Sequence, residues 1–136
     1  MLHLANIQDI NSILPWNGPL GVLGLKVAPA LATGNVIIIK PSEKTPFAAA
    51  ELGKLAIDAG LPPGVFQVLP GNGSTGSILA SHMEIAKVSF TGSVSTGKTV
   101  QTLAAKSNLK RCTLELGGKS PAVVFDDADL DNAVNW

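Results

Sequence analysis

The sequence has one cysteine, no tyrosine and an aromatic content of only 4%. The single cysteine, Cys112, excludes a disulfide within the chain, which favours a reducing compartment such as the cytoplasm. Ten basic and ten acidic residues cancel, so no excess of charge favours nucleic acid or an anionic membrane as a partner. No apolar run approaches the roughly 20 residues needed to span a bilayer, and no secretory signal is recognisable at the N-terminus.

Metal-binding patterns are also missing. The two histidines, His3 and His82, have no neighbouring cysteine, histidine or carboxylate at a spacing typical of a metal site or a catalytic triad. Surface or capping roles explain both residues. The sequence therefore predicts no metal site.

Apolar residues, by contrast, are abundant. They make up 46% of the 136 residues, enough for a single domain that buries about two thirds of its unfolded surface. We expect residues 1–136 to form one domain, with residues 1–11 as an N-terminal extension.

The order of the predicted elements indicates an α/β fold. Strand-like and helix-like segments alternate, which predicts an open, Rossmann-like parallel sheet with helices on both faces. The continuous apolar runs at 36–40, 65–69 and 88–90 are typical of central strands. The other expected strands are 12–15, 111–115 and 121–125, and the expected helices are 19–33, 45–59, 75–82 and 94–106. Ligands bind at the carboxyl ends of the strands in such sheets.

Glu115 is the most informative side chain of the sequence. It ends a predicted strand and is followed by Leu116 and two glycines, Gly117 and Gly118, which allow a ligand or another backbone to come close. A glutamate held partly out of water at this place has a raised pKa and can act as a general acid or base. The alternative is a solvated carboxylate at the end of a strand.

The turn after residues 88–90 is the strongest candidate anion site. Gly92 permits close backbone approach, and Ser93 begins a predicted helix whose free N–H groups favour a phosphate. An ordinary N-cap serine is the alternative. Residues 92–99 also match the P-loop pattern G-x-x-x-x-G-K-[ST], so a P-loop nucleotide binder is a remote alternative.

Several motifs together resemble the NAD(P)-dependent aldehyde dehydrogenase superfamily. The segment Leu-Glu-Leu-Gly-Gly-Lys-Ser-Pro at residues 114–121 resembles the glutamate signature of that family. Further similar segments occur in the family's order at residues 15–17, 40–46, 60–65 and 90–93. The similarity covers residues 15 to 132. It implies an oxidoreductase that acts on aldehydes with NAD, of which this chain resembles a truncated piece.

The resemblance assigns cofactor contacts to five residues. Lys40 and Glu43 match the family's ribose contacts, Gly92 and Ser93 match the turn that receives the pyrophosphate, and Gly73 lies in a loop similar to the one beside the adenine. A carboxylate at Glu43 disfavours a 2′-phosphate, so NAD is expected over NADP. Without the resemblance, Glu43 is explained as a solvated charged residue in a loop.

The resemblance also bears on catalysis. Asn17 matches the asparagine whose amide stabilises the oxyanion in the family; its alternative is a turn-former before Gly18. The family's nucleophilic cysteine lies more than thirty residues beyond the Glu115 position, and only 136 − 115 = 21 residues follow Glu115 here. Cys112 does not replace it, because strict alternation puts Cys112 on the face of the strand opposite to Glu115.

Three functions therefore compete. In the first, the chain is a cofactor-binding part of an aldehyde dehydrogenase that is not competent alone. In the second, it is a truncated homologue that uses Glu115 for non-redox acid–base chemistry, such as isomerisation, cyclisation or dehydration. In the third, it is a structural, dimerising module. The expected partners are a small molecule and a second copy. We expect the copies to meet through the helix face of Leu20, Leu23 and Val27 and through the last helix, which ends at Val134 to Trp136.

Overall fold

The computed structural model describes residues 8–135, in which strands and helices alternate from the first strand to the fourth helix. Five strands form one sheet: β1 (Asp9–Ile13), β2 (Val36–Lys40), β3 (Phe66–Val68), β4 (Lys87–Gly92) and β5 (Arg111–Leu116). The helices are α1 (Pro19–Ala32), α2 (Phe47–Asp58), α3 (Gly73–Ser81), α4 (Val94–Lys106) and α5 (Leu130–Val134).

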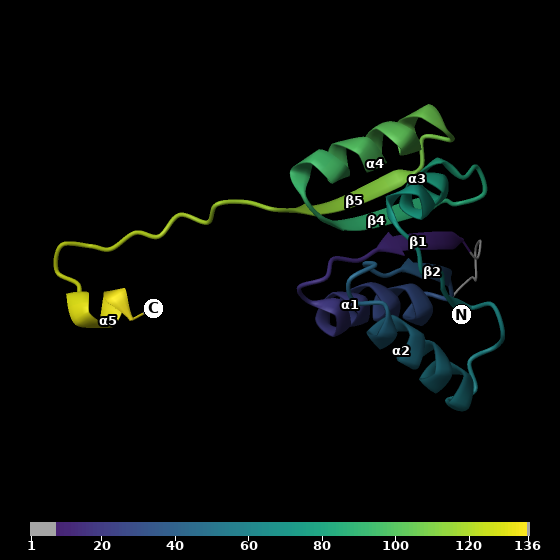
Figure 1. Ribbon diagram of the computed structural model, residues 1–136, viewed down its shortest axis with the longest axis horizontal. Helices are drawn as coiled ribbons and strands as arrows, with labels where there is room; N and C mark the ends of the chain where they lie inside the picture. The colour runs from purple at the N-terminus through teal and green to yellow at the C-terminus, as the bar shows by residue number, and fades with distance from the viewer. Residues whose placement is uncertain (1–7, 136) are drawn as a thin grey trace.

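The sheet is entirely parallel, with the strand order β3-β2-β1-β4-β5. Helices α1 and α2 cover one face, and α3 and α4 cover the other (Figure 1). The predicted open, Rossmann-like α/β fold is therefore confirmed. From β1 the chain adds β2 and β3 on one side and then crosses to add β4 and β5 on the other side. A ligand crevice is expected at the carboxyl edge where the strand order reverses, between β1 and β4.

The core consists of two apolar clusters, one on each face of the sheet. Ile13, Val88 and Phe90 pack with residues of α3 and α4 on one face, and Ile37 and Ile39 pack with residues of α1 and α2 on the other. Strands covered on both faces bury successive side chains, which is why the run at 36–40 is continuously apolar.

Three strand predictions are corrected. Residues 65–69 were expected to form a central strand, but β3 lies at the edge of the sheet. Residues 9–11, assigned above to the N-terminal extension, belong to β1, the strand in the middle; the extension's residues 1–7 lie outside the described residues. The expected strand at 121–125 is wrong, because these residues pair with no described strand and Val123, Val124 and Phe125 are exposed.

Two helix predictions are also corrected. Leu23 and Val27 are buried against the sheet, so the proposed association face of α1 is reduced to the exposed Leu20. The helix expected at 45–59 starts later, because its N-cap is Pro46, and the Thr45 hydroxyl has no hydrogen-bond partner among the described residues. Within residues 8–135, no helix has the length and apolarity to cross a membrane.

A buried lysine fixes the start of β5. The ammonium group of Lys110 donates to the carbonyl of Ala80 at 2.9 Å and to the hydroxyl of Ser107 at 2.5 Å. These two acceptors lie at the C-terminal ends of α3 and α4, where a cation is favoured by the helix dipole. Burial lowers the pKa of Lys110 below its usual range. Lys110 thereby ties both helices to the strand that carries Glu115.

Candidate functional site

A cavity of about 680 Å³ lies at the carboxyl edge of the sheet. It is lined by the ends of the central strands, by the loops that follow them and by the first turns of α3 and α4. Every site residue predicted from the sequence contributes to its wall: Asn17, Lys40, Glu43, Gly73, Gly92, Ser93 and Glu115. Residues up to a hundred positions apart in the chain therefore meet in one place because parallel strands end at the same edge.

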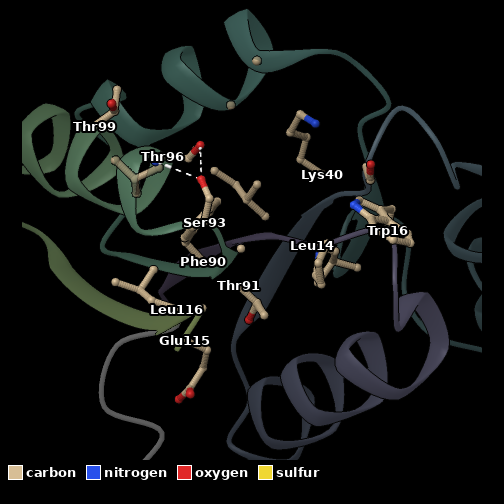
Figure 2. Close-up of a pocket in the computed structure, with 18 of the residues that line it drawn as sticks. Leu14, Trp16, Lys40, Phe90, Thr91, Ser93, Thr96, Thr99, Glu115 and Leu116 are labelled. Carbon is tan, nitrogen blue, oxygen red and sulfur yellow. Dashed lines mark hydrogen bonds between the residues drawn. The ribbon is translucent and has the colours of Figure 1, made fainter. Parts of the chain in front are cut away.

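Ser93 caps α4 on the cavity side. Its hydroxyl accepts a hydrogen bond from the backbone N–H of Thr96 at 3.2 Å and donates to the Thr96 hydroxyl at 2.9 Å (Figure 2). Ser93 is thus the N-cap of α4, which the sequence offered as the alternative to an anion contact. The N–H groups of the first turn and the positive end of the helix dipole favour an anion at this place.

The P-loop interpretation of residues 92–99 does not fit this geometry. Gly97 and Lys98 lie inside α4, after its start at Val94. A P-loop needs a glycine-rich loop whose N–H groups surround the phosphates before the helix begins. Residues 92–99 therefore match the P-loop in sequence pattern but not in backbone geometry.

Lys40 is a buried cation at the end of β2. The residue is only 4% exposed, and its ammonium group donates to the carbonyl of Pro41 at 2.9 Å and lies 3.8 Å from the carboxylate of Glu43. Burial lowers the pKa of Lys40, and the Glu43 charge opposes that effect. An ammonium group has three N–H donors, so Lys40 retains donor capacity toward the cavity.

The start of α3 forms another part of the cavity wall. Asn72 caps this helix by accepting from the backbone N–H of Ser74 at 3.0 Å. A Cβ on Gly73 would meet no atom within 4 Å, whereas one on Gly76 would lie 3.6 Å from the Lys40 side chain. α3 therefore packs beside Lys40 at Gly76, where a Cβ would make an ordinary contact, and Gly73 leaves open space at the rim.

Glu115 and Asn17 line the same cavity, but both are exposed. The sequence predicted a Glu115 carboxylate held partly out of water; within the described residues that prediction is wrong, because no described element covers the end of β5 on this side. Figure 2 shows the carboxylate pointing away from Ser93 and Lys40. Glu115 lies beside Thr91 in the register of β4 and β5, and the Thr91 hydroxyl is buried without a hydrogen-bond partner.

Cys112 does not line the cavity. It is partly buried and packs against the apolar cluster of Val88 and Phe90. Burial raises the pKa of its thiol, with Lys110 acting in the opposite direction. A thiol with a raised pKa is a poor nucleophile, so the predicted role of Cys112 as a small buried hydrophobe is supported.

Several cavity residues were not anticipated from the sequence. Thr96 and Thr99 present hydroxyls from α4, and Ser42 does so from the loop after β2. Thr96 and Thr99 are spaced i, i+3 and so lie on one side of α4, but the sequence does not say that this side faces the cavity. Trp16 is 59% exposed at the rim, with the Lys44 ammonium 5.6 Å from its ring centroid.

Metal ligands do not gather at this site. Among residues 8–135, no group of three or more histidine, cysteine or carboxylate side chains is placed to hold a metal ion. The polar groups of the cavity are instead hydroxyls, backbone N–H groups, the Asn17 amide, one buried ammonium and two carboxylates. This set suits a ligand that carries both phosphates and sugar hydroxyls.

Comparison with known proteins gives one consistent result. Residues 9–136 match the model of the aldehyde dehydrogenase family. An aldehyde dehydrogenase of Agaricus bisporus is 58% identical over 131 residues, which cover 96% of this chain and 26% of that protein. The cytosolic aldehyde dehydrogenase 1 of Mus musculus is 55% identical over 125 residues, 91% of this chain and 25% of that protein.

Solved structures agree with the sequence comparisons. A lactaldehyde dehydrogenase from Escherichia coli superposes with a TM-score of 0.90 at 50% identity, over 94% of this chain and 27% of the other. PnpE, solved in complex with nicotinamide adenine dinucleotide, superposes with a TM-score of 0.89 at 48% identity, over 95% of this chain and 26% of the other. The chain thus spans about a quarter of the length of the relatives it matches.

Proposed function

The chain belongs to the aldehyde dehydrogenase family, and we propose that it forms the NAD-binding part of an oxidoreductase that acts on aldehydes. The convergence of Lys40, Glu43 and Ser93 on one cavity at the carboxyl edge of the sheet is the observation that carries this proposal. A relative of known structure, PnpE, holds nicotinamide adenine dinucleotide.

The residues present fit such a cofactor. Ser93 and the first turn of α4 would hold the pyrophosphate, since free N–H groups and the helix dipole favour phosphate oxygens. Lys40 would donate to ribose hydroxyls, and Glu43 would accept from them. The exposed turn at Gly73 offers room for the adenine. When bound, NAD supplies the hydride acceptor of the reaction.

Two further residues are proposed for the reaction itself. Asn17, at the rim of the cavity, would donate its amide N–H to a developing oxyanion. Glu115, which also lines the cavity, would accept or return a proton as a general base or acid. The chain's one cysteine is turned into the core, so we propose that these residues alone do not complete covalent aldehyde oxidation.

The location of the protein in the cell is also a proposal. One relative is named a cytosolic aldehyde dehydrogenase, and the single partly buried cysteine fits a reducing compartment. We propose a cytoplasmic location on these grounds.

A second candidate function has one specific observation in its favour. Glu115 and Asn17 line the same cavity, which places a carboxylate and an amide donor around one volume without any cysteine. Proton abstraction beside a carbonyl needs such a pair: a base for the proton and a donor for the enolate oxygen. Non-redox acid–base catalysis is therefore the second candidate.

NAD binding tests the first proposal. Titration calorimetry of the purified chain is expected to detect NAD binding, and Lys40→Met is expected to weaken that binding by about 10- to 150-fold, since one charge-assisted hydrogen bond contributes about 1.5–3 kcal/mol. Lys54→Met is the matched control, because Lys54 lies exposed on α2, outside the cavity, and forms an ion pair with Glu51. Equal affinity of wild type and Lys40→Met would remove Lys40 from the site.

Cofactor choice gives a separate prediction. The Glu43 carboxylate repels a 2′-phosphate, so NADP is expected to bind about tenfold or more weakly than NAD. Glu43→Gln keeps a hydrogen-bonding group but removes the charge, and is expected to narrow the ratio of the two dissociation constants. An unchanged ratio in competition titrations would mean that Glu43 does not contact the ribose.

A further inference from the structure

Lys110 is a buried cation that lies outside the cavity. The residue is only 8% exposed, does not line the cavity and forms no ion pair with a carboxylate among residues 8–135. Burying an ammonium group is costly unless hydrogen bonds replace its water. An apolar side chain would fill the same volume without that cost, so the role of this lysine must lie in the groups to which it donates.

The ammonium group of Lys110 connects the C-terminal ends of two helices. One acceptor, the carbonyl of Ala80, belongs to the last turn of α3, and the other, the hydroxyl of Ser107, belongs to the C-cap residue of α4. The Ser107 hydroxyl in turn donates to the carbonyl of Ala104 at 2.9 Å. The charge therefore lies where the dipoles of both helices favour a cation, and one side chain joins α3 to α4.

Asn108 reinforces this connection from a neighbouring position. Its side-chain amide donates to the carbonyls of Met83 at 2.6 Å and Ile85 at 3.0 Å, in the segment that follows α3. Its side-chain carbonyl accepts from the backbone N–H of Lys110 at 3.2 Å. Between these two residues, Leu109 has a φ of 57°, a left-handed conformation that persists in a residue other than glycine only where the surroundings impose it. The turn between α4 and β5 is therefore held in one conformation.

The opposite ends of the same two helices form part of the cavity wall. The helices lie side by side on one face of the sheet (Figure 1), and their first turns contribute Gly73, Gly76, Ser93 and Thr96 to the lining. At 1.5 Å per residue, the 13 residues of α4 span about 20 Å and the 9 residues of α3 about 13 Å. Because helices of this length are stiff, a change in the distance between their C-terminal ends also changes the distance between their first turns.

We propose that Lys110 is a positioning residue for the dinucleotide: by joining the C-terminal ends of α3 and α4, it fixes the distance between their first turns and so the fit of the adenosine diphosphate half of the cofactor. This inference rests on the NAD binding proposed above. With the pyrophosphate at Ser93 on α4 and the adenine beside Gly73 on α3, that half of the cofactor contacts both helices. Lys110 touches no part of it and acts only through the spacing of the helices.

The spacing of the helices can be measured without any ligand. Spin labels attached at Ser74→Cys on α3 and Lys98→Cys on α4, both exposed positions, report this spacing by double electron–electron resonance in a Cys112→Ser background. Lys110→Met has a side chain of similar length without N–H donors, and is expected to shift or broaden the distribution of distances between the labels. Lys106→Met changes an exposed lysine in the last turn of α4; as the matched control, it is expected to leave the distribution unchanged.

The affinity for the cofactor is the second measurement. Lys110→Met is expected to weaken the binding of NAD and of ADP about 2- to 30-fold in titration calorimetry, the range typical of residues that act on a site without touching it. Ser107→Ala removes one of the two acceptors and is expected to change both the spacing and the affinity in the same direction by less, so the test does not depend on Lys110→Met folding. Leu52→Ala removes packing on the opposite face of the sheet and is expected to lower the melting temperature without changing the affinity.

The outcomes separate this inference from the proposed function. A changed distance between the labels together with weaker NAD binding supports the role of Lys110. If the wild type binds NAD, then an unchanged distance or an unchanged affinity in folded Lys110→Met, or in Ser107→Ala in its place, overturns that role. A loss of affinity no larger than in Leu52→Ala overturns it as well, since lost stability alone would explain the effect. A folded wild type that binds no NAD would contradict the proposed function itself, and the role of Lys110 with it.

Discussion

The purified chain is expected to produce no NADH from aldehydes. Covalent oxidation requires a thiolate that attacks the carbonyl from within the substrate cavity. The thiol of Cys112 lies outside that cavity and packs in the core, where burial raises its pKa. Absorbance at the NADH band, followed with a series of aliphatic and aromatic aldehydes at saturating NAD, measures the result directly.

Cys112→Ser provides the control for this prediction. The variant removes the only thiol of the chain and is expected to leave the same zero rate, while a full-length relative in the parallel assay shows that the reagents are active. Steady NADH formation that disappears in Cys112→Ser would contradict the account, since it would make the buried thiol the nucleophile.

The second large effect concerns Glu115. Any exchange that the chain catalyses at the carbon beside an aldehyde carbonyl is expected to fall about 10²–10⁴-fold in Glu115→Gln, the usual contribution of a general base. Glutamine keeps the size and hydrogen bonding of the side chain but has no basicity. Deuterium uptake from heavy water by a small aldehyde, followed by nuclear magnetic resonance, gives the rate.

The matched control is Glu84→Gln, which changes an exposed carboxylate outside the cavity. It is expected to leave the exchange rate unchanged. If Glu115→Gln and Glu84→Gln exchanged at the wild-type rate, the carboxylate at the end of β5 would have a structural role only, and the acid–base candidate would lose its base.

The fold was predictable from the sequence where periodicity and length agreed. The run at 36–40 is apolar on both faces and became β2, covered by helices on both sides. The order of strands was not predictable in the same way. The run at 65–69 is just as apolar, yet β3 lies at an edge, because strand order depends on which connections pack together and not on the apolar content of one strand.

The candidate site was predictable as a set of residues, since the motifs that follow parallel strands must meet at one edge. The burial of each of these residues was not predictable from the sequence. Lys40 is buried and Glu115 is exposed, although both stand at strand ends. The difference arises because α3 packs over the end of β2 through Gly76, whereas no described element covers the end of β5. Residues 121–125 have the composition of a strand but meet no partner strand, and composition alone does not supply one.

Dinucleotide binding at the carboxyl edge is the central claim, and backbone amide mapping tests it most directly. Nuclear magnetic resonance spectra of the labelled chain, recorded during titration with NAD, are expected to show saturable shifts at the amides of Glu43, Gly73, Ser93 and Thr96, with none at Ala56 on the far part of α2. Shifts confined to other parts of the chain, or no saturable shift in a folded sample, would contradict the account.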